Sequence, residues 1–208
     1  MHHGSDAGVI QVLGSYFVQY FSPSGLNPLP KSVVFVIDVS GSMSGAKISQ
    51  TRQAMHAILN QLRAGDLFNI VLFSGAVSQW KADAVMATNG NIQDAKAFVD
   101  DHVHAEGNTN INDALLTALK LLKNTAEQQG SAIAGKVPMV LFLTDGQPTA
   151  GETTPSRIRA NILRANVIEA SIFALGFGFN LEFDFLKALS AENGGTARRI
   201  YQIGRAHV

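Results

Sequence analysis

Apolar residues along the chain follow two different spacings in alternation, which predicts strands and helices in turn. Short continuous runs of Val, Ile, Leu and Phe at 33–37, 67–73 and 137–144 are typical of strands buried on both faces of a sheet. Between these runs apolar residues recur every three or four positions, which indicates amphipathic helices that cover the sheet. We expect these helices over 48–62, 91–103, 155–167 and 181–192, and from 111 onward.

The remaining strands complete a fold prediction. A short strand at 77–80 follows 67–73 closely enough for an antiparallel hairpin, and further strands are expected at 170–176 and, on the sheet edge, 198–203. Strands that alternate with helices favour a parallel sheet covered on both faces. The predicted fold class is therefore α/β: a doubly wound, mostly parallel, Rossmann-like sheet of six strands with one short antiparallel edge strand.

The chain divides into four predicted parts. The first residues, Met-His-His-Gly-Ser, resemble a remnant of an expression vector, and 1–8 are assigned to it. Residues 9–30 hold a strand over 9–21 and a linker rich in Pro and Gly, and this strand is expected to pack beside the domain or to pair with another chain. The α/β domain is expected at 31–204, with a tail at 205–208. Because its start resembles a vector remnant, the chain is expected to be an excised piece of a larger protein.

Candidate chemistry begins where the strand at 33–37 stops. Asp38, Ser40 and Ser42 follow it, and the strand at 137–144 ends in the same manner, in Asp145. Because the carboxyl ends of parallel strands meet at one edge of an open α/β sheet, these side chains are expected to lie close together. Thr109, in the loop before the helix that starts at 111, is the best candidate for a further oxygen donor. Carboxylates and hydroxyls favour Mg²⁺, Mn²⁺ or Ca²⁺ over zinc or copper.

These five residues, in this order and spacing, resemble the metal-ion-dependent adhesion site of a von Willebrand factor type A domain. Four longer phrases are similar more specifically to the A domain of inter-alpha-trypsin inhibitor heavy chains, namely 47–54, 65–73, 176–186 and 197–201. The resemblance covers roughly 31 to 202. The loop departs from the commonest form of the motif in one place, because Asn108 stands where a second glycine is frequent.

The resemblance implies a function and a setting. In this family Ser40, Ser42 and often Thr109 would touch the metal directly, while Asp38 and Asp145 act directly or through water. The ion then attracts a carboxylate of a partner protein, so the resemblance implies a binding domain and not an enzyme. Heavy chains imply a secreted protein whose partners are matrix or serum proteins. Hyaluronan attachment in that family depends on a region beyond this domain and is not assigned here.

Composition limits the classes of partner that are expected. Lys plus Arg and Asp plus Glu number 16 each, so the formal charge is zero and neither nucleic acid nor an anionic membrane is an expected partner. No apolar run has the length of a membrane-spanning helix, so no membrane insertion is expected. The chain has no cysteine, which excludes disulfides and thiolate metal sites. Nothing in the residues indicates an oligomeric state.

Alternatives stay open at this point. Asp38 could simply cap the following helix, but that reading leaves the other oxygen donors unexplained. An intracellular or bacterial A-domain protein that acts in complex assembly is a second reading. A Mg²⁺-dependent phosphohydrolase is a third, although Ser40 stands where aspartyl phosphatases need a second acid. His102 and His104 have a spacing compatible with a soft metal but lack a third ligand.

Glu106 and a group of aromatic residues each allow a functional and a structural interpretation. Glu106 could act beside the metal, although a solvated loop charge is the simpler reading. Five aromatic residues of the chain more often indicate packing than ligand stacking, but exposed ones near the metal face could form a hydrophobic rim. These aromatic residues are Trp80, Phe177, Phe179, Phe183 and Phe185.

Overall fold

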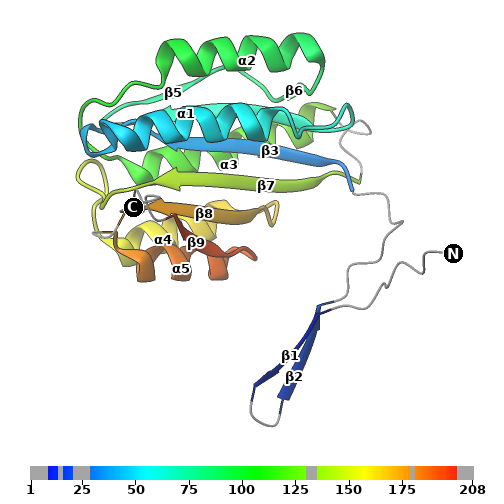
Figure 1. Cartoon of the computed structure of the whole chain (residues 1–208), viewed down its shortest axis with the longest axis vertical. Coiled ribbons are helices and arrows are strands. Elements are labelled where there is room, and N and C mark those ends of the chain that lie inside the picture. The colour runs from blue at the N-terminus through cyan, green and yellow to red at the C-terminus, as the bar shows by residue number, and fades with distance from the viewer. Residues whose placement is uncertain (1–8, 14–15, 21–28, 130–134, 179–180, 201–208) are drawn as a thin grey trace, which may run out of the picture.

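A computed structural model describes residues 9–13, 16–20, 29–129, 135–178 and 181–200. Its main feature is a seven-stranded sheet in the order β5-β4-β3-β7-β8-β9, with β6 also paired to β4 (Figure 1). The strands are β3 (Lys31–Asp38), β4 (Leu67–Phe73), β5 (Val77–Gln79), β6 (Val85–Met86), β7 (Val137–Thr144), β8 (Ser171–Phe177) and β9 (Ala197–Ile200). All pairings in this sheet are parallel except those of β5 and β6 with β4.

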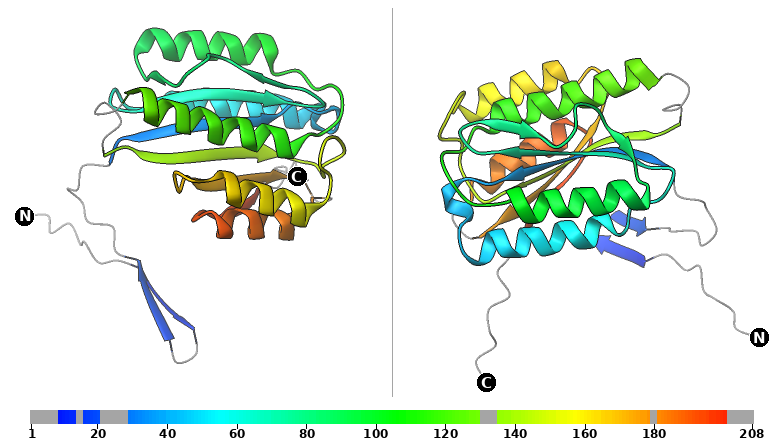
Figure 2. Two further views of the ribbon diagram at one scale, coloured as in Figure 1. Left: turned by 180° about the vertical axis from the view of Figure 1, so that it is seen from behind. Right: turned by 90° about the horizontal axis from the view of Figure 1, so that it is seen from above.

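Helices cover both faces of the sheet, as the two views of Figure 2 show. On one face α1 (Ala46–Leu59) and α2 (Asn89–His102) enclose a core built on β3 and β4. On the other face α3 (Ile111–Gln129), α4 (Pro155–Ala165) and α5 (Phe183–Glu192) enclose a second core. The central strands β3 and β4 are almost wholly buried, because helices cover both of their faces.

The strand order reverses between β3 and β7. From β3 the chain crosses by α1 to β4 on one side, whereas from β7 it crosses by α4 to β8 on the other. The two crossover helices lie on opposite faces, so they diverge at the carboxyl ends of β3 and β7. In open α/β sheets ligands bind at this position. Asp38 and Asp145 both lie there.

The predicted fold class is confirmed, and two details are corrected. The sheet has seven strands and not six, because β6 adds a second short antiparallel segment at the start of β4. A two-residue strand gives no period to detect. The predicted single strand over 9–21 is instead a hairpin of β1 (Val9–Leu13) and β2 (Tyr16–Tyr20), which form a two-stranded sheet of their own. Apolar residues continue on both sides of Gly14-Ser15, so sequence alone did not separate the strands.

Element ends differ by a few residues from the predicted ones. Helix α1 stops at Leu59, before the predicted end at 62. Helix α5 starts at Phe183 and not at the predicted 181, and Leu181 lies in the core just ahead of the helix. The last strand ends at Ile200 in the structure, and its predicted continuation over 201–203 lies outside the described residues. The division of the chain into domain, linker and tail stays a prediction. None of the described helices is both long and apolar enough to cross a membrane.

Candidate metal centre

Asp38 is the most deeply buried member of the site. It is the last residue of β3 and has no exposed surface. Its Oδ1 accepts a hydrogen bond from the Ser40 backbone N–H at 2.8 Å, and its Oδ2 accepts one from Thr144 Oγ1 at 2.5 Å. Burial raises the pKa of Asp38 above its ordinary value; hydrogen bonds from Ser40 and Thr144 oppose that shift, and nearby Asp145 adds to it. The charged carboxylate is therefore held at a cost that a bound cation would offset.

Two serine hydroxyls connect the loop after β3 to the second acid. Ser42 lies in the short 3₁₀ helix Gly41–Met43, and its Oγ is 3.1 Å from Ser40 Oγ. Ser42 Oγ also donates a hydrogen bond to Asp145 Oδ1 at 2.8 Å. Asp145 follows β7 directly, and its side chain is fully buried. The tight turn after Asp38 thus brings donors from two neighbouring strand ends into one cluster.

Thr109 is held in place by the loop after β7. Its backbone N–H donates to Thr149 Oγ1 at 2.9 Å, and its carbonyl accepts from the N–H groups of Thr149 and Ala150 at 2.9 and 3.2 Å. The Thr109 side chain reaches the serines: a Cβ atom at Gly146 would lie 3.6 Å from both Thr109 Oγ1 and Ser42 Oγ. The two hydroxyls therefore face the same side of Gly146, where the glycine leaves open space.

The structure brings all five predicted residues together at one edge of the sheet. The donor set is two carboxylates and three hydroxyls, all hard oxygen ligands that fit a divalent cation such as Mg²⁺, Mn²⁺ or Ca²⁺. Within the described residues no three His, Asp or Glu side chains gather in a way that could hold a metal. The fit to a metal therefore depends on the hydroxyls as much as on the acids.

Three residues in contact with this cluster were not singled out from the sequence. Thr144 donates a hydrogen bond to Asp38, and Thr149 accepts one from the Thr109 backbone N–H. The Lys47 ammonium donates to Asp145 Oδ2. The Lys47 Nζ also donates to the Ser42 carbonyl at 3.1 Å. Thr144 could have been found from its position beside Asp145. Lys47 and Thr149 carry no local signal, because their roles depend on how the loops fold.

The other candidates have structural partners. His102 stacks on the Phe98 ring at 4.4 Å, and its Nδ1 lies 3.1 Å from the Phe98 carbonyl. Glu106 has an exposed side chain, while its backbone N–H donates to the Val39 carbonyl at 2.7 Å. That backbone bond attaches the Thr109 loop to the loop after β3.

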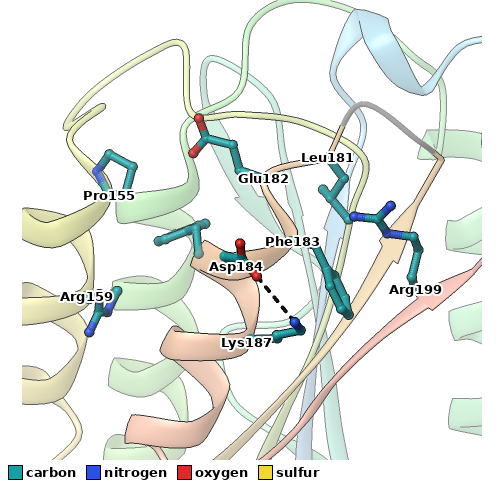
Figure 3. A pocket seen from close by; sticks show the side chains of 9 residues that line it. Pro155, Arg159, Leu181, Glu182, Phe183, Asp184, Lys187 and Arg199 are labelled. Carbon is teal, nitrogen blue, oxygen red and sulfur yellow. Dashed lines mark hydrogen bonds and ion pairs between the residues drawn. The ribbon is translucent and has the colours of Figure 1, made fainter.

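The aromatic group divides between core and surface. Phe177 and Phe185 are buried in the two cores, and Trp80 stacks on Phe68 with 5.2 Å between ring centroids. Phe179 lies outside the described residues. Phe183 is half-buried and lines a pocket of about 620 Å³ between the starts of α4 and α5 and β9 (Figure 3).

Two cations flank the Phe183 ring in this pocket. Lys187 Nζ lies 5.1 Å and Arg199 Cζ 4.9 Å from the ring centroid, distances at which cation–π attraction acts. Lys187 also pairs with Asp184. Phe183 is thus the one described member of the phenylalanine group that is not fully buried.

Comparison with known proteins gives a consistent result. The model of the von Willebrand factor type A domain matches residues 32–205. Human inter-alpha-trypsin inhibitor heavy chain H4 is 47% identical over 195 residues, which cover 94% of this chain and 21% of that protein. Human heavy chain H6 is 46% identical over 200 residues, which cover 94% of this chain and 15% of that protein. The chain thus spans about a fifth or less of the length of these relatives.

Solved structures show the same fold at lower identity. A von Willebrand factor type A protein from Catenulispora acidiphila superposes with a TM-score of 0.73 at 20% identity, covering 89% of this chain and 40% of that one. Proximal thread matrix protein 1 from the mussel byssus, described with a zinc-occupied metal-ion-dependent adhesion site, superposes with a TM-score of 0.58 at 18% identity, covering 82% and 42%.

Proposed function

The chain belongs to the von Willebrand factor type A family, and from that membership we propose that it is a metal-dependent protein-binding domain. A divalent cation is held by Asp38, Ser40, Ser42, Thr109 and Asp145, and an acidic side chain of a partner completes its coordination. The convergence of these five oxygen donors at the switch point of the sheet carries the proposal.

The composition of the site explains why it would bind a partner. Three of the five donors are neutral hydroxyls, so the two carboxylates at most balance the charge of a divalent ion and leave no excess negative charge to repel a partner's carboxylate. Ser42 is exposed at this edge of the sheet, which leaves a side from which a partner can approach. A carboxylate is the protein group best suited to such an ion, because Mg²⁺ and Ca²⁺ prefer charged oxygen ligands.

The preference of the site among divalent ions is testable. The donor set favours Mg²⁺, Mn²⁺ or Ca²⁺, whereas the mussel protein is described with zinc at its site. Titration calorimetry on the metal-stripped domain with all four ions decides between them. We expect saturable binding of at least one ion, weakened at least about tenfold in Asp38→Ala and in Thr109→Ala through loss of direct or second-sphere contacts.

Matched controls separate the site from general effects of mutation. Asp94 lies exposed on α2 and Thr117 lies on α3, outside the cluster, so Asp94→Ala and Thr117→Ala should retain the affinity of the unmodified domain. Absence of binding for all four ions in the unmodified, folded domain would refute the proposal.

The likeness to heavy chains supports a secreted protein with matrix or serum partners, and it favours this reading over an intracellular or bacterial assembly protein. Purified matrix and serum proteins can be screened for binding in Mg²⁺ and in EDTA. Binding that requires the cation, and that is lost in Asp38→Ala, identifies a partner. Replacing its acidic residues with amides should then abolish the interaction.

We propose binding and not catalysis for the same edge of the sheet. Ser40 stands two residues after Asp38, where a phosphatase with an aspartyl nucleophile needs an acid. In the described structure the hydrogen-bond partners of Asp38 are Ser40 and Thr144, which are not general bases at neutral pH. Turnover of a generic phosphate ester in Mg²⁺, lost in Asp38→Asn, would overturn this part of the proposal.

A further inference from the structure

Lys47 is an unusual neighbour for a cation site. Its Nζ contacts Asp145 Oδ2 directly and lies 3.1 Å from the Ser42 carbonyl, so an ammonium sits among the groups proposed to hold a metal. Ser42 Oγ donates to the other oxygen of the same carboxylate at 2.8 Å. Both oxygens of Asp145 are thereby occupied by donors of the protein itself.

The ammonium is held by more than one element. The Lys47 side chain is 26% exposed, while the Asp145 side chain that it pairs with is fully buried. At Gly178, directly after β8, a Cβ atom would lie 3.7 Å from Lys47 Cε, so the chain there passes close to the lysine stem. Lys47 thus lies between the turn after β3, the end of β7 and the end of β8.

The position of Lys47 on α1 argues against a role in helix stability. It is the second residue of α1, and the first turn of that helix contains no acid. The positive end of the helix dipole disfavours a cation there. The lysine is therefore held by Asp145 and Ser42 and not by its own helix.

We propose that Lys47 is an internal competitor of the divalent cation: its ammonium neutralises Asp145 in the metal-free domain, and the ion must displace it to bind. This inference rests on the proposed metal site and adds a control on its occupancy. An ammonium and a divalent ion that share one carboxylate repel each other in a partly buried site, where solvent screening is weak. The lysine therefore lowers the affinity for the metal and stabilises the metal-free state.

The test compares Lys47→Met with the unmodified domain by titration calorimetry with Mg²⁺ and Mn²⁺. Methionine keeps an unbranched stem of similar length and removes the charge. We expect the dissociation constant to fall about tenfold or more, in line with the removal of one unit of positive charge close to the ion. Lys123 pairs with Glu127 on the surface of α3, so Lys123→Met makes the same change in net charge and should leave the constant within about twofold.

Thermal unfolding provides a second readout that does not depend on affinity. In EDTA, Lys47→Met should unfold at a lower temperature than the unmodified domain, because the buried Asp145 carboxylate loses its counter-charge. Saturating Mg²⁺ should then raise the unfolding temperature of this variant more than that of the unmodified domain. If methionine prevents folding, Lys47→Gln removes the charge with a polar end group and carries the same expectations.

The outcomes distinguish failure of this inference from failure of the proposed function. Equal or weaker metal binding by a folded Lys47 variant overturns the competitor role while leaving the metal site intact. Absence of binding in both the variant and the unmodified domain refutes the metal site itself. Binding that appears only in the variant supports the competitor role but refutes the proposed function of the unmodified domain, because the ammonium then excludes the ion.

Discussion

At the scale of single residues, the site combines deep burial with charge. Asp38 has no exposed surface, and its raised pKa means that the ionised form destabilises the folded, metal-free domain at neutral pH. Residues with this conflict between stability and charge are typical of functional sites. The fold accommodates it with hydrogen bonds from Ser40 and Thr144.

Replacing Asp38 with Asn should separate stability from metal binding. The amide oxygen can accept from the Ser40 N–H, and the amide nitrogen can donate to Thr144 Oγ1, so both hydrogen bonds survive without the buried charge. We expect the unfolding temperature in EDTA at pH 7 to rise by about 2–8 °C and the increase caused by Mg²⁺ to disappear. Calorimetric unfolding with and without Mg²⁺ measures both; a lower temperature in EDTA would contradict the account.

Gly146 offers a way to fill the site while keeping every donor. Its Cβ would lie 3.6 Å from Ser42 Oγ and Thr109 Oγ1, which is ordinary van der Waals contact, so Gly146→Ala should fold with a change in stability within about 1 kcal/mol. The added methyl group faces both hydroxyls, and we expect metal affinity to fall about tenfold or more. Unchanged affinity by titration calorimetry would show that the ion does not use this side of the cluster.

The two acids of the candidate site were predictable from the sequence because they stand directly at strand ends. Asp38 and Asp145 end the two apolar runs that became β3 and β7, and parallel strands place such ends together. Lys47 was not predictable as a site residue, since its contact with Asp145 joins positions 98 apart in the chain. Only the folded arrangement of three loops shows that contact.

At the scale of elements, the sequence predicted the alternation of strands and helices and missed the shortest strand. Long periodic segments such as α3 and buried runs such as β4 carry a strong signal, whereas the two residues of β6 carry none.

The end of β3 opposite the proposed metal centre is held by hydrogen bonds to a buried acid. Asp66, just before β4, accepts hydrogen bonds from Lys31 Nζ at 2.5 Å, the Lys31 N–H at 3.0 Å and the Arg63 N–H at 2.9 Å.

Asp66 should contribute stability that depends on pH. Burial alone would raise the pKa of Asp66, but the bonds from Lys31 and Arg63 together lower it. Because its pKa is lower in the folded than in the unfolded chain, the contribution is complete well above the unfolded value of about 3.9 and is lost as the pH falls through the folded value. Asp66→Asn should cost about 1–3 kcal/mol at pH 7.

Urea unfolding of both proteins between pH 7 and pH 3 measures this dependence. The difference between the unmodified domain and Asp66→Asn should stay constant down to about pH 5 and then shrink. The exposed Asp94→Asn serves as the matched control, with little difference at any pH. A difference that is independent of pH would show that Asp66 acts through shape and not through its charge.

At the scale of the whole molecule, the hairpin of β1 and β2 forms a sheet separate from the seven-stranded one (Figure 1). Two-stranded sheets are marginal in water without further support. The seven-stranded sheet has its own two cores, and the described members of both begin at Val33. The proposed metal centre likewise uses residues of that sheet and its loops.

Removing residues 1–28 should therefore leave the domain intact. We expect the unfolding temperature to change by less than about 3 °C and the affinity for Mg²⁺ by less than about twofold, because none of the described core or site residues is removed. Differential scanning calorimetry and metal titration of the shortened chain check this. A large loss of stability would show that the hairpin packs on the domain in solution.

The central place of β3 has a mechanical consequence. The strand starts at Lys31, where the amino-terminal part of the chain enters, and ends at Asp38, where a partner would attach through the metal. A pulling force between these two points runs along the strand and loads its parallel ladders with β4 and β7 in shear. Many hydrogen bonds then resist together instead of opening one after another, so tension transmitted through this protein would meet its most strongly connected strand first.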